Sequence, residues 1–328
     1  MFILKTFLMF ELVVFFHEFG HFLVAKKFGV FVSEFSVGFG PVILKKNFKK
    51  TKFCLRFFLI GGFVRFKDLE FKNVSFLKKA LIFLAGPFFN LLIGLISIAF
   101  VLILQKKFNS LEVEKTKSYC VLIKPEDEIK AINQKKVFCV DDFLYELKKV
   151  PLKQEVNLTV KRGLKEVELK NVGKILKTNK GEKKSLGISL KIKKLTFLEF
   201  FVQTFNNFMF ILKTVFSSFL NIFKPKDFFN EISGPIGLFK TVKLAEKGGI
   251  CALIYLFSFF TINIGIFNLL PFLALDGGQF LSLVLKKIFK PTRINRNFYF
   301  ILNFLEILIL FSLFIFVTIK DFFKIMVY

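Results

Sequence analysis

The chain of 328 residues contains only two histidines, four cysteines and no tryptophan. None of Cys54, Cys120, Cys139 and Cys251 belongs to a Cys-x-x-Cys pair, which excludes zinc-ribbon and thioredoxin-like sites. Cys120 and Cys139 lie in one polar segment and could form a disulfide if it is exported, although we favour two unpaired thiols. The apolar N-terminus lacks a small-residue cleavage site, so we expect a retained first helix rather than a signal peptide.

Acidic residues are also scarce, because 50 Lys and Arg oppose 24 Asp and Glu, giving a net charge of +26. The basic residues form neither one tract nor a known nucleic-acid-binding motif, so we expect no nucleic-acid partner. The 53 phenylalanines and the absence of tryptophan indicate a codon bias toward AT-rich triplets. We therefore expect much of the positive charge to lie on solvated faces and the rest to favour anionic lipid headgroups.

Apolar residues dominate the composition. They make up 54% of the chain, and the mean hydropathy of +0.58 is too high for an ordinary soluble domain. We predict a polytopic α-helical membrane protein that lies in a lipid bilayer and has about four transmembrane helices. The expected spans are residues 2–25, 80–104, 250–275 and 298–319.

Between the spans the sequence predicts other structure. The short basic segment 26–79 contains two β-like runs and is expected to form membrane-associated β-structure. Residues 106–195 are polar and Lys-rich, with short strands and a helical stretch at 141–149, which predicts a small inserted α+β module. Residues 195–223 favour an amphipathic interfacial helix. The predicted domains are a membrane half at 1–105, the module at 106–195, and a second membrane half at 196–328.

The strongest pattern is His17-Glu18-Phe19-Gly20-His21, which lies inside the first apolar segment. On a helix, His17 and His21 share one face and can bind one metal ion. Glu18, next to the first ligand, can take a proton from a water that the metal activates. The alternative is a helix with incidental polar residues, but such groups in a lipid-facing helix would be costly without a role.

Glu11 is an oddity in the same segment, about two turns before His17. It faces the protein interior or lies near a membrane surface, and the sequence leaves both readings open.

Zinc needs a third protein ligand that still leaves one position open for catalysis. The chain offers no other histidine and no cysteine cluster, so we expect a carboxylate from a membrane segment. Asp276 is the candidate, because it ends an apolar run in which Pro271 interrupts the helix. Gly277 and Gly278 permit a tight bend there. The alternative role of Asp276 is to cap a helix that begins near Gln279.

Taken together, the motifs resemble the bacterial site-2 proteases, the zinc intramembrane metalloproteases of regulated proteolysis. They are similar to the subgroup that carries a PDZ module between the second and third core helices. The similarity covers nearly the whole chain in order. The matching segments are residues 17–25, 35–41, 61–64, 85–90, 233–237 and 268–278.

The resemblance implies a role for each motif residue. It implies a Zn²⁺ cofactor bound by His17, His21 and Asp276. Glu18 would be the general base, and Asn268 would position the substrate strand or stabilise the oxyanion. An extended substrate would pair with the edge of the β-structure near its glycines, for which plain turn geometry is the alternative. These glycines are Gly38, Gly40, Gly61 and Gly62.

The resemblance also implies a function, namely cleavage of transmembrane segments in the bacterial inner membrane. The substrate would be a membrane protein such as an anti-sigma factor already trimmed by another protease, or a remnant signal peptide. Short basic stretches at 26–79 and 286–296 are expected in the cytoplasm, with the active site nearby and the PDZ-like module outside.

Some family positions differ. Leu273 and Ile60 replace prolines, and the stretch preceding Lys124 is shortened. A spacer or size filter is therefore as good an interpretation of the module as a peptide-binding groove.

Three other functions fit parts of the sequence. A membrane-anchored zincin would normally hold its motif in a soluble loop and use a glutamate as the third ligand. A catalytically inactive membrane scaffold that recruits partners through its PDZ-like domain predicts an eroded motif. A metal transporter would need polar residues along several spans. The apolar setting and the intact motif disfavour all three.

Overall fold

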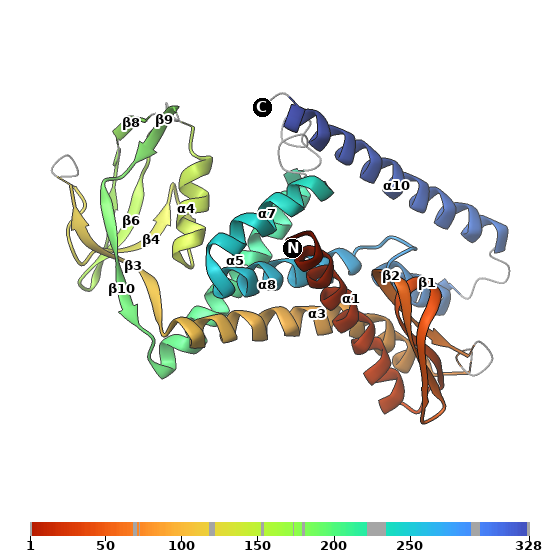
Figure 1. Cartoon of the computed structure of the whole chain (residues 1–328). Helices are drawn as coiled ribbons and strands as arrows, with labels where there is room; N and C mark the ends of the chain where they lie inside the picture. Colours follow the sequence, from red (N-terminus) through yellow and green to blue (C-terminus); the bar gives the residue numbers. More distant parts are fainter. Residues whose placement is uncertain are drawn as a thin grey trace. The chain divides into compact units, whose positions relative to one another are not determined.

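The computed structural model describes residues 2–67, 71, 73–117, 122–151, 154–172, 174–178, 181–221, 234–289 and 296–326. They form two compact units (Figure 1), one of Met1–Ser97 with Val215–Tyr328 and the other of Ile98–Thr214. Cys120, Ser233 and most of the basic stretch 286–296 lie outside the described residues.

Three helices in the described part of the chain are long and apolar enough to cross a membrane. They are α1 (Phe2–Lys27), α3 (Phe76–Gln105) and α8 (Gly249–Asn268). The prediction that the third span reaches residue 275 is wrong, because α8 ends just before the interruption at Pro271, whose ring cannot donate a backbone hydrogen bond. In the predicted fourth span the chain forms one helix, α10 (Arg296–Met326), and its crossing of the membrane stays a prediction.

Helix α1 packs against the shorter α7 (Pro235–Lys247) and against α8. Met9 and Val13 of α1 form a buried cluster with Val242 and Phe260, and the ring of Phe10 stacks on Phe260 with centroids 5.0 Å apart. This packing fixes the first half of the helix that carries both histidines.

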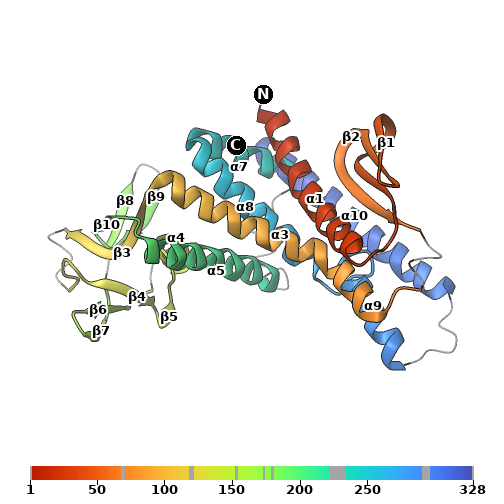
Figure 2. The same cartoon turned by 90° about the horizontal axis from the view of Figure 1, so that it is seen from below.

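Strands β1 (Val32–Phe48) and β2 (Thr51–Phe66) form a long antiparallel hairpin beside α1 (Figures 1 and 2). The register shifts repeatedly near Gly38, Gly40 and Gly61, which adopt φ values of 83°, 84° and 104°. Only glycine takes such angles without strain, so the glycines bend the strands as bulges do. Both strands are longer than the predicted runs because the chain stays paired through these bends.

The second unit is the α+β module. Its six-stranded sheet has the order β10-β3-β4-β6-β7, with β5 paired to β4. The helix α4 covers a core of Val113, Ile129, Phe143 and Leu158, among others. The sequence predicts a strand over 113–123, whereas β3 begins at Lys107 and ends at Thr116, because its first residues pair with β10; residues 118–121 lie outside the described part of the chain. The elements are β3 (Lys107–Thr116), β4 (Glu128–Ile132), β5 (Lys135–Lys136), α4 (Val140–Lys149), β6 (Leu158–Arg162), β7 (Lys165–Leu169), β8 (Lys174–Thr178), β9 (Gly181–Ser185) and β10 (Ile188–Lys194).

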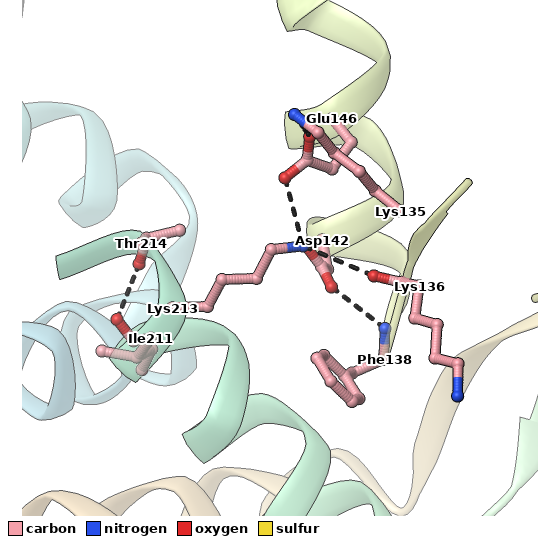
Figure 3. Close-up of polar contacts among 8 residues, drawn as sticks. All are labelled: Lys135, Lys136, Phe138, Asp142, Glu146, Ile211, Lys213 and Thr214. Atoms are coloured by element: carbon pink, nitrogen blue, oxygen red, sulfur yellow. Dashed lines mark hydrogen bonds and ion pairs between the residues drawn. The ribbon is translucent and has the colours of Figure 1, made fainter. Parts of the chain in front are cut away.

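A charge cluster fastens α4 to helix α5 (Phe197–Asn221) inside this unit (Figure 3). Nζ of Lys213 lies 2.7 Å from Oδ1 of Asp142 and 3.1 Å from Oε1 of Glu146. Asp142 is fully buried, and its other oxygen accepts the N–H of Phe138 at 3.0 Å. Burial raises the pKa of Glu146, but the hydrogen bond from Lys213 together with the positive charges of Lys213, Lys135 and Lys149 outweighs it, so the net pKa lies below the ordinary value. The glutamate therefore stays ionised beside the lysine.

Candidate metal centre

His17 and His21 lie one above the other on a single face of α1, as their spacing of four residues dictates. Their Nε2 atoms are 3.2 Å apart, and both side chains are buried. Two imidazole nitrogens on one helix thus point to the same place, and this helix is apolar enough to span a membrane.

Asp276 joins them from the other end of the chain. Its Oδ2 lies 2.9 Å from Nε2 of His17 and 3.2 Å from Nε2 of His21. Among the described residues, these three form the one group of His, Cys, Asp or Glu side chains with metal-binding geometry, their ligand atoms lying within 4.8 Å of one another.

The bend before Asp276 carries its carboxylate to the histidines. Helix α9 (Asp276–Phe289) begins at Asp276 itself rather than near Gln279. A Cβ at Gly277 or Gly278 would collide with the backbone of Leu269 or Phe272, so the tight bend requires both glycines. Glu306 of α10 accepts the N–H of Ala274 at 3.2 Å and steadies the bend.

The geometry of the three atoms fits a zinc ion. Ligands at zinc–nitrogen and zinc–oxygen distances of about 2.0–2.1 Å in a tetrahedron lie about 3.3 Å apart, close to the separations seen here. Two histidines and one carboxylate are also a donor set that leaves a fourth position open. The residues present therefore suit the metal that the pattern predicts.

Neighbouring groups orient both imidazole rings. Nδ1 of His21 lies 2.7 Å from the carbonyl oxygen of Ile82 and must donate to it, which leaves the Nε2 lone pair for a metal. Nδ1 of His17 lies 3.4 Å from Nδ2 of Asn90. Asn90 is fully buried, and its Oδ1 has no hydrogen-bond partner in the described part of the chain. With the Asn90 amide rotated by 180°, Oδ1 would accept a hydrogen bond from the Nδ1–H that His17 carries when Nε2 binds a metal.

Helix α3 closes the site from one side through Gly86. A Cβ there would lie 2.8 Å from both Cε1 and Nε2 of His17 and would also collide with the His21 ring. Gly20 makes a similar close approach to the Ala85 carbonyl. The sequence placed Gly86 only within the matching segment 85–90, and its contact with both histidine rings was not predicted.

A cavity of about 430 Å³ opens beside the three ligands. Glu18 and Asn268 line it together with the three ligands, so the structure brings together every predicted catalytic and metal residue. Asn268 also donates from Nδ2 to the Ile264 carbonyl at 3.1 Å, which holds its side chain against α8. The cavity further includes Gln279, Phe63 and Val64, which the sequence reasoning did not single out.

The predicted glycines lie at different distances from this cavity. Gly62 is the nearest, since a Cβ there would lie 3.4 Å from Cγ of Glu18. Gly61 donates its N–H to Glu11. Gly38 and Gly40 pack against Phe58 across the hairpin and do not line the cavity.

Residues 5–313 match the sequence model of peptidase family M50. The chain belongs to peptidase family M50. It is 32% identical over 302 residues to a protein of Fusobacterium nucleatum, which covers 85% of this chain and 86% of the relative. It is 29% identical over 335 residues to a protein of Clostridium perfringens, covering 98% of each. Both relatives carry the name "Putative zinc metalloprotease".

Membership of family M50 confirms the resemblance of the motifs to the site-2 proteases. The protein is a zinc-dependent metalloprotease of the membrane, with three candidate spanning helices in its described part.

Proposed function

We propose that this M50 protease is an intramembrane endopeptidase that cleaves transmembrane segments of other membrane proteins, with His17, His21 and Asp276 as its zinc ligands. The observation that carries the proposal is the position of the centre. Both histidines belong to the apolar helix Ile3–Lys27, so the ligands lie at a depth where a spanning substrate passes. A zincin with a water-exposed motif would not need this apolar setting.

Zinc, when bound by these ligands, supplies Lewis acidity toward a water molecule and toward the scissile carbonyl. Glu18 lines the cavity next to the ligands, so its carboxylate can accept the proton of that water and deliver it to the leaving amine. Asn268 lines the same cavity and is placed to hold the substrate backbone. The apolar lining from Phe63 and Val64 keeps bulk water away from the reacting bond.

The substrate strand would pair beside the hairpin. A helix must unwind before its peptide bond reaches the site, and an unwound segment in lipid needs partners for its backbone groups. Phe63 and Val64 of β2 line the cavity, and a substrate strand added beside them would supply those hydrogen bonds.

The remaining expectations belong to the same proposal. We place the protein in the bacterial inner membrane with the metal centre near the cytoplasmic side. The reason is that short basic segments, such as the one that contains the hairpin, are usually found in the cytoplasm. The module then lies outside and acts as a PDZ-like binding domain or as a size filter. A substrate already trimmed by another protease, such as an anti-sigma factor or a remnant signal peptide, fits a site that admits one unwound segment.

The test uses the purified full chain in detergent and in vesicles, with zinc content measured alongside cleavage. One probe is a labelled single-span peptide in the bilayer, and the other is a soluble peptide with the same bond in a shorter context. Wild type should cut the single-span peptide. Glu18→Gln should keep zinc but lose a factor of about 10²–10⁴ in kcat. Cleavage of the soluble peptide alone would contradict the proposal.

A matched control is Glu246→Gln. Glu246 also contacts α1, through Lys5, but it lies outside the cavity. This variant should cut like wild type, so that loss of cleavage in Glu18→Gln is traced to the carboxylate beside the ligands and not to the removal of any glutamate from this unit.

A further inference from the structure

The glutamate that the zinc site does not use, Glu11, is buried in the catalytic helix. It is only 8% exposed, whereas its neighbours Leu8 and Leu12 are about half exposed at 46% and 49%. The side chain therefore points into the protein and not toward lipid. An ionisable group on the inward face of a spanning helix usually has a functional role, because burying it without one is costly.

The carboxylate of Glu11 reaches the hairpin. Its Oε2 accepts the backbone N–H of Gly61 at 3.1 Å, and the backbone of Gly38 also faces the carboxylate. Gly61 has a φ of 104° and Gly38 a φ of 83°, so Glu11 contacts the hairpin at the point where both strands bend. Only glycine adopts these angles without strain, and the Gly61 N–H donates to a side chain of α1.

The same face of α1 holds the general base. Glu11, Val14 and Glu18 are three and four residues apart, and Gly62 lies against Val14 and Glu18. The backbone of Val64 faces the carboxylate of Glu18, and both residues line the cavity. Two carboxylates of one helix thus face the same strand, Glu11 through a hydrogen bond at position 61 and Glu18 beside position 64.

The two spacings match. Seven residues of α-helix span about 10.5 Å. Three residues of β-strand span about 10 Å. Strand β2 therefore runs alongside α1 in a fixed register, with Glu11 at one end and Glu18 at the other. If the Gly61 end were released, β2 could slide relative to the base.

We infer that Glu11 is a positioning residue that fixes the register of β2 against the catalytic helix and thereby sets which peptide bond of the substrate reaches Glu18. This inference rests on the proposed function, in which the substrate strand pairs beside β2. A substrate that pairs with β2 inherits the register of that strand, because each residue of slip moves the bond presented to the site by one position.

If Glu11 served only the stability of the fold, we would expect its carboxylate to be fully hydrogen-bonded or replaced by an apolar side chain. Oε1 of Glu11 is buried and has no hydrogen-bond partner among the described residues, so the carboxylate is only partly satisfied. A leucine at this place would avoid burying a charge in a spanning helix. Glu11→Leu should therefore keep or raise the thermal midpoint while it impairs the reaction, a combination typical of residues retained for activity.

The experiment compares the full-length wild type with Glu11→Leu, Glu11→Gln and the control Glu246→Gln in detergent. The substrate is a labelled single-span peptide, and its products are identified by mass spectrometry. Glu11→Leu should cut at several neighbouring bonds, with a KM raised about tenfold, the order that one charge-assisted hydrogen bond contributes. Its zinc content should match that of wild type. Glu11→Gln keeps an oxygen for the Gly61 N–H and should restore the single cleavage position.

Hydrogen exchange gives a readout that needs no activity. Amides of residues 61–64 should exchange faster in Glu11→Leu than in wild type or Glu246→Gln. Cleavage at one unchanged bond with a wild-type KM, or unchanged exchange at these amides, would overturn the inference. Should wild type itself fail to cut the single-span peptide, the proposed function falls, and the exchange comparison still decides whether Glu11 holds β2.

Discussion

Nε2 of His21 lies 3.2 Å from Oδ2 of Asp276, across 255 positions of the sequence. This contact brings the N-terminal helix and the C-terminal membrane half to one point. It makes the ligand set depend on the bend between α8 and α9, not only on the His-Glu-x-x-His pattern.

The first prediction concerns that carboxylate. Asp276→Asn removes the anionic ligand and should lower zinc affinity by at least about 100-fold, since even outer-shell partners of zinc ligands contribute 10- to 100-fold. Zinc bound after dialysis against a chelator series measures the change. Asp321→Asn is the control, because this buried carboxylate accepts the N–H of Gly237 on α7 and lies outside the metal-binding group. Full zinc occupancy in Asp276→Asn would show that the ligand is another group.

The second prediction concerns Gly86. Gly86→Ala places a methyl group against both histidine rings and should displace their Nε2 atoms, so zinc content and proteolysis should both fall. The control is Gly94→Ala on the same helix, where the added Cβ meets the side chain of Ile262 instead. Both variants should lose some thermal stability, but only Gly86→Ala should lose zinc. Equal zinc content in the two variants would contradict the close approach described here.

The third prediction concerns the cluster in Figure 3. Lys213→Met leaves Asp142 and Glu146 buried without their cation and should destabilise the module by about 3–5 kcal/mol. Hydrogen exchange of residues 135–149 in the full chain measures the loss. Lys191→Met, which breaks a solvated pair with Glu112, should have little effect. If the Lys213 variant exchanged like wild type, α5 would not be fastened to α4 through this cluster.

The fourth prediction concerns pH. Burial raises the pKa of Asp127, but the hydrogen bonds from Arg162 and from the Lys124 N–H, together with the positive charges of these two residues, outweigh it, so the pKa lies below its ordinary value of 3.8. Because its pKa is lower in the folded state than in the unfolded state, Asp127 stabilises the module at pH values above its ordinary pKa of 3.8. This stabilisation disappears as the pH falls through the folded value. The unfolding midpoint of the module should therefore be nearly constant down to about pH 5 and fall below about pH 4.

Asp127→Asn tests the assignment to this residue. The variant should be less stable than wild type at pH 7, because Arg162 loses its charged partner, and its midpoint should fall less steeply below about pH 4. If the unfolding midpoint of the variant fell as steeply below about pH 4 as that of wild type, other carboxylates would cause the fall.

The sequence predicted most of the helices and the residues of the centre because their signals are local. The long apolar segments of the sequence indicate α1 and α3, and a spacing of four residues puts His17 and His21 on one face of a helix. Asp276 could be chosen by elimination, since an isolated acid in an apolar run has few other roles. These arguments need no knowledge of the tertiary structure.

Other features depend on contacts between distant segments. The end of α8 and the start of α9 follow from backbone packing at Gly277 and Gly278, which apolar length does not reveal. The roles of Gly86 and Asn90 depend on α3 lying against α1, and the environment of Glu11 depends on the path of the hairpin. A single sequence shows which residues are present, but it does not show which distant residues they contact in the folded protein.

The separation of the ligands along the chain has a consequence for biosynthesis. His17 and His21 are made first, but a site with two imidazoles alone binds zinc weakly and cannot hold it in catalytic geometry. Asp276 follows only after the hairpin, the module and α8 have been made. With the proposed ligand set, the metal centre is therefore complete only when the segment that carries Asp276 has joined α1, and the protease stays inactive until then.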